Sequence, residues 1–452
     1  MLTEAHRNKR YLIIGLGLTG LSCARFCKKH GLDFTLCDTR SELPGLTAIR
    51  TEFPANDIHL GELTTDLLCQ YDELLVSPGI SVQTQVFREA EARGVTVSGD
   101  IQLFHEVAER PVIAITGSNG KSTVTTLVNE LINASGKQAV AGGNLGTPAL
   151  ELLEQEKNTD FYVLELSSFQ LETTRNLGAQ VAVILNVSPD HMDRYEGMDG
   201  YQAAKQRIFQ GAQTIVVNRD DEQSLPQQSA SAPQRSFGLD AAAESDFGTL
   251  EKDGALWLAR GEDALLPASD LKIRGGHNIA NALAALAIID ALGMDVRRCL
   301  SALVNYPGLA HRCQWISRIS GVDYFNDSKG TNVGSTVAAV KGLSHGLAGR
   351  IWLIAGGEGK GQDFVELAEV CEKHPVAEVL LFGADRKKIQ GDLAGRAETS
   401  LYETLDEAVE YAAEHSVAGD IVLLSPACAS FDQFRNYVHR GEHYCQCVGG
   451  LE

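Results

Sequence analysis

Short apolar runs rich in β-branched residues alternate with longer runs of helical spacing along most of the chain. In the first hundred residues the strand-like runs are 11–14, 34–38 and 73–79, the last of which ends in a turn, and a helical run through Ala24 and Phe26 follows the first. Strands that alternate with helices are typical of a parallel sheet. We therefore expect an α/β fold in this segment.

A second segment begins near Pro111 and contains the strand-like runs 112–116, 161–165 and 181–186. Their uninterrupted apolar character suits strands that are buried on both faces of a sheet. From about 220 to 270 the composition becomes polar and rich in Gln, Ser and Ala. There we expect an insertion that has irregular structure or short antiparallel strands.

An Ala/Leu-rich stretch from Asn278 to Gly293 predicts a helix that packs back on this second sheet. Pro307-Gly308 is the best candidate for a second boundary. Beyond it, the runs 351–355, 378–382 and 421–424 each predict a parallel strand, with helices between them.

Length and charge narrow the class of protein. A chain of 452 residues with 44% hydrophobic and 22% charged residues is globular and too long for one core, so two or three domains are expected. The net charge of −20 argues against nucleic-acid binding, which depends on basic side chains. No apolar stretch could span a bilayer, and the polar residues 1–10 contain no secretion signal. Ten scattered cysteines indicate free thiols in a reducing cytosol, and we expect no metal site at Cys445-Gln-Cys447.

The stretch Gly117-Ser118-Asn119-Gly120-Lys121-Ser122-Thr123 lies between a predicted strand and a predicted helix. A glycine turn that leads into a helix directs backbone N–H groups at a phosphate. Lys121 adds a mobile positive charge, and the hydroxyl of Ser122 can bind Mg²⁺. The spacing departs from the usual P-loop, because Ile115 stands where that pattern has its first glycine. An ordinary strand-to-helix turn is the alternative, but the combination favours nucleotide phosphate binding.

A second glycine turn, Gly15-x-Gly17-x-x-Gly20, is followed by Asp38 at the end of the next predicted strand. This matches the dinucleotide fingerprint, but the same turn can hold any pyrophosphate at a helix N-terminus. The ligand of this turn could be NAD or a UDP-type molecule. A turn that serves only helix–strand packing is a third alternative. The predicted architecture is thus α/β with a Rossmann-like N-terminal domain (1–108), a central P-loop mononucleotide-binding domain (109–307) and a Rossmann-like C-terminal α/β domain (308–452).

Other candidate side chains follow predicted strands, where ligands collect in open α/β sheets. Glu165 ends a strand of the central segment, and a carboxylate there can complete a Mg²⁺ shell with the hydroxyl of the phosphate loop. His191 follows the next strand and fits a site or a structural role equally well. From the residues alone, Lys205 on the following helix is a surface lysine. The loops 326–332, 356–360 and 425–432 also follow predicted strands and carry polar or charged side chains.

Nine motifs occur in an order that resembles the Mur ligase family of cytoplasmic peptidoglycan synthesis, and the resemblance covers essentially the whole chain. They are GLGLTG (15–20), TGSNGKST (116–123), GGNLGTP (142–148), ELSSFQLE (165–172), DHMDRY (190–195), HN (277–278), HRC (311–313), NDSKGTN (326–332) and SPACASFDQF (425–434). The DNPR motif of the sibling ligases for diaminopimelate does not occur in this sequence.

The resemblance implies an ATP-dependent ligase that joins D-glutamate to UDP-N-acetylmuramoyl-L-alanine through an acyl phosphate, with the three domains binding the UDP substrate, ATP and the amino acid. It implies ATP, two Mg²⁺ ions and a carbamylated Lys205 as a metal ligand, which reverses the interpretation of that lysine as a surface residue. The other partners are the two small-molecule substrates, without nucleic acid or membrane insertion, and the protein is expected to be a cytoplasmic monomer.

The resemblance also implies a role for individual residues. The catalytic residues are Lys121, His191, Lys205 and Lys329, and the metal ligands are Ser122, Glu165, His191 and Lys205. ATP binds Gly117, Ser118, Asn119, Gly120, Lys121, Ser122, Thr123, Asn278, Arg312, Asp327 and Lys329. The UDP substrate binds Leu18, Thr19, Asp38, Thr39, Arg40, Ser77, Pro78, Gly79 and Asn144, and D-glutamate binds Thr331, Lys360, Ser425 and Phe431.

Three other functions fit part of the pattern. An NAD-dependent oxidoreductase would use the first glycine turn but would leave the phosphate loop without a role. A nucleotide-gated switch would bind ATP without forming a bond. A folylpolyglutamate-type ligase of the same superfamily would lack the UDP-binding first domain.

Overall fold

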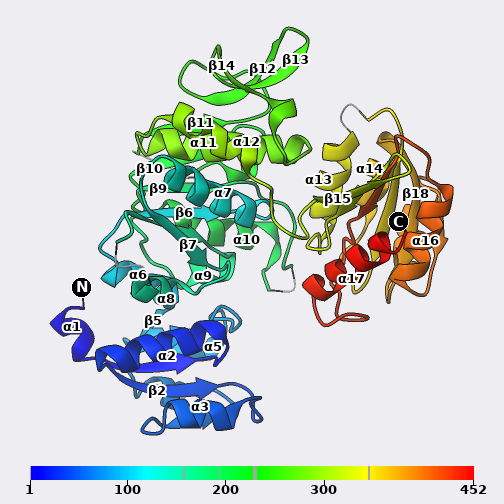
Figure 1. Cartoon of the computed structure of the whole chain (residues 1–452). Coiled ribbons are helices and arrows are strands. Elements are labelled where there is room, and N and C mark those ends of the chain that lie inside the picture. Colours follow the sequence, from blue (N-terminus) through cyan, green and yellow to red (C-terminus); the bar gives the residue numbers. More distant parts are fainter. Residues whose placement is uncertain (1, 156–157, 193, 228–231, 345–346, 452) are drawn as a thin grey trace.

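The computed structural model describes residues 2–155, 158–192, 194–227, 232–344 and 347–451. They form three sheets in chain order, each with its own helices (Figure 1). The three-domain α/β architecture predicted from the sequence is confirmed, while the boundaries at 108/109 and 307/308 stay predictions. No helix in these ranges is long and apolar enough to cross a membrane.

The first sheet is parallel throughout and has the strand order β3-β2-β1-β4-β5. Its order reverses between β1 and β4, so the loops after these two strands flank one crevice. The strands are β1 (Arg10–Ile14), β2 (Asp33–Asp38), β3 (Ile58–Leu60), β4 (Glu73–Val76) and β5 (Thr96–Ser98), and the helices are α1 (Glu4–Arg7), α2 (Leu18–His30), α3 (Leu46–Glu52), α4 (Thr65–Leu68), α5 (Gln85–Ala92) and α6 (Asp100–Val107).

The second sheet has nine strands in the order β14-β13-β12-β11-β10-β9-β6-β8-β7. The strands are β6 (Val112–Thr116), β7 (Ala139–Gly143), β8 (Phe161–Glu165), β9 (Val181–Ile184), β10 (Thr214–Asn218), β11 (Gln234–Phe237), β12 (Phe247–Lys252), β13 (Ala255–Arg260) and β14 (Asp263–Pro267). The helices are α7 (Lys121–Ala134), α8 (Ala149–Gln155), α9 (Ser168–Glu172), α10 (Gly197–Gln206), α11 (Gly276–Ala291) and α12 (Leu300–Asn305).

The polar segment expected to be irregular or antiparallel continues this sheet. Strand β11 pairs in parallel with β10, and β12 to β14 form an antiparallel meander at the sheet edge (Figure 1). The expectation of short antiparallel strands is therefore confirmed for β12 to β14. Its polar composition reflects an edge position, since β12 and β13 are exposed at the turn between them.

The third sheet has the order β15-β16-β20-β17-β18-β19, with only β15 antiparallel to its neighbour. The strands are β15 (Gln314–Ile319), β16 (Val322–Asn326), β17 (Ile351–Gly356), β18 (Val376–Phe382), β19 (Thr399–Leu401) and β20 (Ile421–Leu424). The helices are α13 (Val333–Ser344), α14 (Val365–Lys373), α15 (Arg386–Leu393), α16 (Leu405–His415) and α17 (Tyr437–Gly449).

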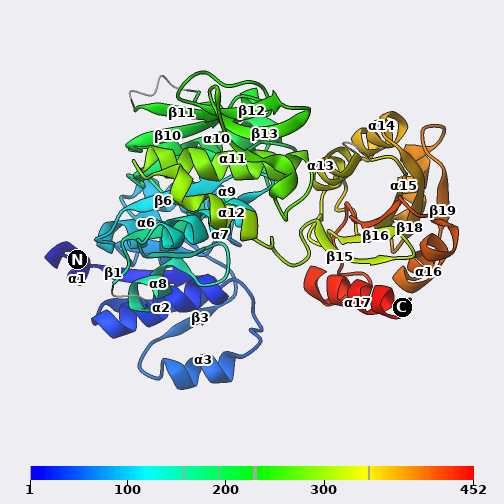
Figure 2. The same cartoon turned by 45° about the horizontal axis from the view of Figure 1, so that its top comes forward.

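The first two domains share a buried apolar cluster, whereas the third domain has apolar clusters of its own. One buried cluster contains side chains of β1, α2 and α6 together with side chains of β6, β8 and α8. The third domain has two clusters of its own, with α13 to α15 on one face of its sheet and α16 and α17 on the other. Figure 2 shows this third domain beside the other two, connected by the chain that follows α12.

Candidate functional site

The phosphate loop follows β6, an inner strand of the second sheet. Strand β6, buried along its whole length, is flanked by β8 and β9, and all three are parallel. Their carboxyl ends therefore meet at one edge, where the strand order reverses, and this edge is the usual ligand position in open α/β sheets. Gly120 caps α7 with a φ of +80°, and a Cβ atom there would lie 2.5 Å from Oδ1 of Asn281. Glycine is thus required at this turn by both backbone conformation and space.

Lys121 folds back over this loop. Its Nζ atom donates to the carbonyl oxygens of Gly117 at 2.8 Å and Ser118 at 2.9 Å. Burial lowers the pKa of Lys121, while the nearby carboxylate of Glu165 opposes that shift. A cation that is held only by neutral carbonyls is well placed to turn toward an anionic ligand.

Glu165, at the end of β8, is 2% exposed. The hydroxyl of Ser122 and the side-chain amide of Asn144 both donate to its carboxylate, the amide at 2.7 Å. A guanidinium nitrogen of Arg312, which precedes β15, donates to the hydroxyl of Ser122 at 2.6 Å and so connects the third domain to the phosphate loop. A buried carboxylate beside a hydroxyl is a pair of oxygen donors of the kind that Mg²⁺ binds.

Lys205 on α10 is 1% exposed. The expectation from the residues alone that it is a surface lysine is therefore wrong. Its Nζ atom donates to the carbonyl of Gly117 at 2.9 Å and lies 4.5 Å from the ring centroid of Tyr201. Burial, and secondly the charge of Lys121, lower the pKa of Lys205 well below its usual value. A neutral amine is the form that can react with carbon dioxide.

His191 has a φ of +56°, and its ring lies 4.8 Å from the ring of Phe169. Its Nε2 atom is 3.7 Å from Oδ2 of Asp190. The same carboxylate oxygen accepts a 3.1 Å hydrogen bond from the side-chain amide of Asn332, so the second and third domains also meet here.

A cavity of about 490 Å³ collects these side chains between the second and third domains. All four predicted catalytic residues line it, together with all four predicted metal ligands. The sequence-predicted residues in its wall are Ser118, Asn119, Gly120, Lys121, Ser122, Asn144, Glu165, His191, Lys205, Arg312, Lys329, Thr331, Lys360 and Phe431. Tyr201, Ser335 and Tyr437 also line the cavity, and the sequence analysis did not single them out.

Lys329 and Lys360 lie in loops that follow β16 and β17 of the third domain. Burial, and secondly Arg312, lower the pKa of Lys329 to about 8, and its ammonium group lies 4.1 Å from the ring centroid of Tyr437. Lys121 and Lys360 add to the same positive field. Several cations around one cavity favour an anionic ligand.

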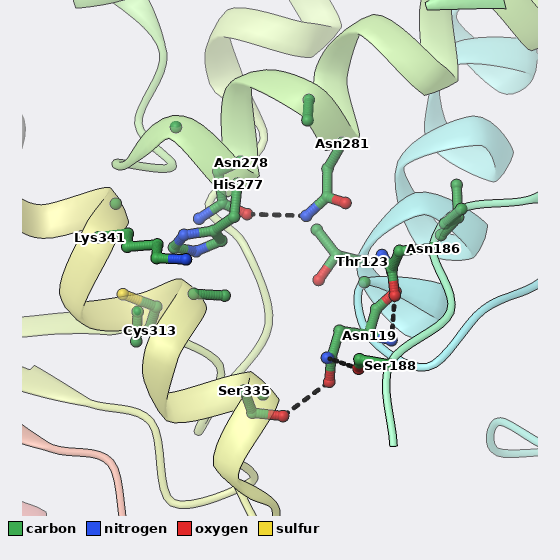
Figure 3. Close-up of a pocket in the computed structure, with 18 of the residues that line it drawn as sticks. Asn119, Thr123, Asn186, Ser188, His277, Asn278, Asn281, Cys313, Ser335 and Lys341 are labelled. Atoms are coloured by element: carbon green, nitrogen blue, oxygen red, sulfur yellow. Dashed lines mark hydrogen bonds between the residues drawn. The ribbon is translucent and has the colours of Figure 1, made fainter. Parts of the chain in front are cut away.

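A second cavity, of about 760 Å³, adjoins the phosphate loop on the side of α11 and α13. It contains the predicted ATP residues Asn119, Gly120, Thr123, Asn278, Arg312, Asp327 and Lys329. Figure 3 shows further side chains that sequence reasoning missed, among them Asn281, which donates to Asn278 at 3.1 Å, and Ser335, which donates to Asn119 at 2.6 Å. Asn281 lies one turn after Asn278 on α11, and this spacing was a signal that could have identified it.

A third cavity, of about 470 Å³, lies at the crevice of the first sheet. It contains all nine predicted UDP-substrate residues, including Asn144 from the second domain. Asp38 accepts hydrogen bonds from the backbone of Leu16 at 2.8 Å and from Nε of Arg40 at 2.7 Å, and the guanidinium of Arg40 lowers the pKa of Asp38 to about 2. Leu18, at the start of α2, is 79% exposed and lines this cavity.

Two of the predicted site residues, Gly117 and Ser425, line none of these three cavities. Gly117 is buried in the loop, where its carbonyl oxygen accepts from both Lys121 and Lys205. Ser425 is fully buried and donates to Asp327 at 2.7 Å, and it lines none of the cavities in the described ranges. The hydroxyl of Ser425 is already hydrogen-bonded inside the third domain. Its contact with D-glutamate therefore stays a prediction.

Arg440 on α17 connects the two loops of the third domain that carry these residues. Its side chain is fully buried and donates to the carbonyl oxygens of Ser328 at 2.8 Å, Cys428 at 3.1 Å and Ala429 at 3.3 Å. It also donates to the hydroxyl of Ser328 at 3.0 Å. The positions of the loops after β16 and β20 thus depend on one side chain.

Replacing Arg440 by methionine should lower the free energy of unfolding of the third domain by about 3 kcal/mol, since each buried acceptor left without a donor costs about 1–3 kcal/mol. Urea unfolding followed by tryptophan fluorescence measures the change in a background of Trp257→Phe, which leaves only the tryptophans of the third domain, Trp315 and the buried Trp352. The exposed Arg435 supplies the matched control Arg435→Met, for which we expect a change within about 0.5 kcal/mol. Equal midpoints for the two variants would contradict the structural role of Arg440.

Comparison with known proteins finds family profiles that match three successive parts of the chain. Three family profiles match it: the Mur ligase MurD-like N-terminal domain at residues 9–99, the Mur ligase middle domain at 115–289 and the Mur ligase glutamate ligase domain at 311–428.

Curated relatives match over almost their whole length. The UDP-N-acetylmuramoylalanine–D-glutamate ligase of Pseudomonas syringae pv. tomato is 49% identical over 437 residues, which cover 97% of both chains. The protein of the same name from Legionella pneumophila is 45% identical over 443 residues, covering 98% of this chain and 99% of the relative. Among solved structures, the UDP-N-acetylmuramate–alanine ligase of Thermotoga maritima shares the fold, with a TM-score of 0.60 at 17% identity over 98% of this chain and all of that one.

Proposed function

This chain belongs to the Mur ligase family, and we propose that it is the ATP-dependent ligase that joins D-glutamate to UDP-N-acetylmuramoyl-L-alanine in peptidoglycan synthesis. The names of relatives that are 45–49% identical over nearly the whole chain support this substrate pair. The observation that carries the proposal is the cavity between the second and third domains, where the phosphate loop, a buried carboxylate and cations of the third domain converge.

Each substrate is assigned to one of the three cavities. The UDP moiety would occupy the crevice of the first sheet, with the L-alanyl carboxylate extending toward Asn144, which lines both this cavity and the central one. ATP would occupy the cavity beside α11, with its phosphates on the loop at 117–123. D-Glutamate would bind from the third domain near Thr331, Lys360 and Phe431.

Two Mg²⁺ ions fit the donor atoms of the central cavity. Ser122 and Glu165 would hold one ion, and His191 with a carbamylated Lys205 would hold the other. The buried Lys205, with its lowered pKa, supports the modification, because attack of a neutral amine on carbon dioxide yields a carbamate and releases one proton. When bound, Mg²⁺ neutralises charge on phosphoryl oxygens.

The reaction needs an activated acid, because a carboxylate is a poor acyl donor. The L-alanyl carboxylate attacks the γ-phosphorus of ATP, ADP leaves, and an acyl phosphate forms. The neutral amine of D-glutamate then attacks the acyl carbon, the nitrogen loses one proton, and inorganic phosphate leaves from the tetrahedral intermediate to give the amide. Lys121 and Lys329 would stabilise the negative charge that develops in both steps. Approach of the third domain to the second would exclude water from the acyl phosphate.

ATP and UDP-linked precursors occur in the cytoplasm, which favours that compartment for the reaction. The protein is still expected to be a monomer. An NAD-dependent oxidoreductase is the weaker alternative, since it assigns no role to the central cavity. A switch protein would bind ATP but would release no phosphate in response to the other two substrates.

Phosphate release from ATP, measured with UDP-N-acetylmuramoyl-L-alanine and either D- or L-glutamate, tests the proposal. We expect release to require both co-substrates and to be faster with D-glutamate by at least about tenfold, because the enantiomer would misplace the amine relative to the acyl carbon. Reactions lacking the amino acid or the UDP substrate are the controls. A preference for L-glutamate would favour the folylpolyglutamate-type alternative, and release without any co-substrate would reject the ligase reaction.

A further inference from the structure

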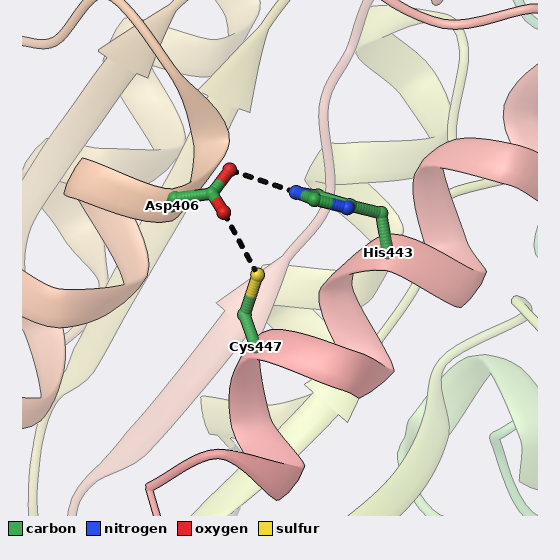
Figure 4. Close-up of side chains that lie close together, drawn as sticks. All are labelled: Asp406, His443 and Cys447. Carbon is green, nitrogen blue, oxygen red and sulfur yellow. Dashed lines mark hydrogen bonds and ion pairs between the residues drawn. The ribbon is translucent and has the colours of Figure 1, made fainter.

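A group of three metal-ligating side chains lies in the third domain, outside the three cavities described above. Asp406 belongs to the first turn of α16, and His443 and Cys447 belong to α17 (Figure 4). Residues four apart on a helix lie on the same side, so the imidazole and the thiol both face α16. Apolar side chains of the two helices share one buried cluster, which fixes their separation.

The side chains are already in contact. Nε2 of His443 lies 2.7 Å from Oδ2 of Asp406, and the thiol of Cys447 donates to Oδ1 of the same carboxylate at 3.6 Å. One ligand atom from each residue lies within 4.8 Å of the other two. In a tetrahedral zinc site the metal–ligand bonds are about 2.0–2.3 Å long, so donor atoms at this spacing need only small side-chain movements to share one ion.

The donor set indicates the class of cation. Nitrogen, sulfur and carboxylate oxygen together suit a borderline ion such as Zn²⁺, whereas Mg²⁺ prefers oxygen alone. In the present arrangement protons on the thiol and the imidazole face the carboxylate, and a cation bound among the three would take the place of these protons. Three protein ligands leave a fourth position for water.

The neighbouring Cys445 does not belong to this group. Its sulfur accepts a hydrogen bond from the side-chain amide of Asn326 on β16 at 3.3 Å. Residues two apart on a helix face different directions, so Cys445 and Cys447 cannot easily share an ion. The sequence expectation that Cys445-Gln-Cys447 is not a metal site is therefore compatible with a site that pairs Cys447 with His443.

We propose that Asp406, His443 and Cys447 form a binding site for one zinc-type cation that ties α16 to α17, separate from the ligase reaction. The cation would bridge two helices on the face of the third sheet opposite α13 to α15. It would stabilise that face by binding the folded state alone.

Titration of the metal-stripped full-length protein with Co²⁺, in excess Mg²⁺ to occupy oxygen-ligand sites, tests the proposal by absorption spectroscopy. We expect one equivalent to produce thiolate-to-cobalt charge transfer together with the visible bands of tetrahedral cobalt, and Zn²⁺ to remove both. In Cys447→Ser the charge-transfer band should disappear, and in His443→Gln the affinity should fall at least about tenfold, since even outer ligands of metal sites contribute factors of about 10–100.

The matched control is Cys445→Ser, which removes a thiol two residues away and should retain the full spectrum. Zinc should also raise the melting temperature of the wild-type protein and of Cys445→Ser, but not that of Cys447→Ser. A charge-transfer band that persists in Cys447→Ser, or no thiolate band in the wild-type protein, would overturn the proposal. These readouts do not use ligase activity, and Cys447→Ser should retain it, so the two proposals can fail separately.

Discussion

Replacing Lys121 by alanine should reduce substrate-dependent phosphate release by at least about 10²–10³-fold, the loss typical for one group that stabilises transition-state charge. Lys121 donates to carbonyl oxygens of the turn that would hold the ATP phosphates, and it lines the central cavity. Among the described residues its Nζ atom donates only to two loop carbonyls and forms no ion pair, so removal of the side chain breaks no direct contact with a carboxylate.

The fold of this variant should remain intact, because Lys121 is only partly buried and water from the cavity can reach the two carbonyl groups that it leaves. A thermal melt followed by circular dichroism checks that point beside the phosphate assay. Lys137, exposed beyond the far end of α7, supplies the control Lys137→Ala, which should keep wild-type activity. Turnover near the wild-type rate in Lys121→Ala would reject the placement of the ATP phosphates.

Lys205→Ala should lose most activity, and short carboxylic acids such as acetate should restore part of it. Truncation leaves space next to Gly117 and Tyr201 that a small carboxylate can enter, where it would replace the carbamate as a source of oxygen ligands. Activity is measured with acetate and with chloride at equal ionic strength, which separates a specific effect from screening.

Lys121→Ala is the control for rescue, because a carboxylate cannot replace a cation, and acetate should leave its activity unchanged. Carbamylation of Lys205 would be contradicted by full activity of Lys205→Ala or by the failure of every short acid to restore activity. An equal gain in both variants would point to a nonspecific effect of acetate.

Lys205 also shows why part of the site could not be predicted from local pattern. On its side of the helix, Gln202 is polar and Tyr201 is apolar, so the local pattern by itself does not predict burial. The side chain is nonetheless buried, because α10 packs against the phosphate loop, 88 residues away in the chain. Only the resemblance to a family suggested a role for this residue.

The strand-end residues were easier to predict. Glu165, His191 and Lys329 each follow a short apolar run, and parallel strands bring their carboxyl ends to one edge of a sheet. The pairing of the second and third sheets around one cavity could not be deduced in that way. It depends on contacts such as Arg312 with Ser122 and Asn332 with Asp190, which join residues separated by more than 140 positions.

Local pattern was enough to predict the inner strands that carry the site, the two glycine turns and the α/β class, because these depend on hydrophobic periodicity and backbone conformation within about ten residues. Tertiary structure alone decided that Lys205 is buried, that Ser425 is turned into the third domain, and that Asp406 meets His443 and Cys447. The physical reason is that burial and side-chain proximity are set by how helices and sheets pack across the whole chain. That packing brings together residues whose separation in sequence carries no local signal.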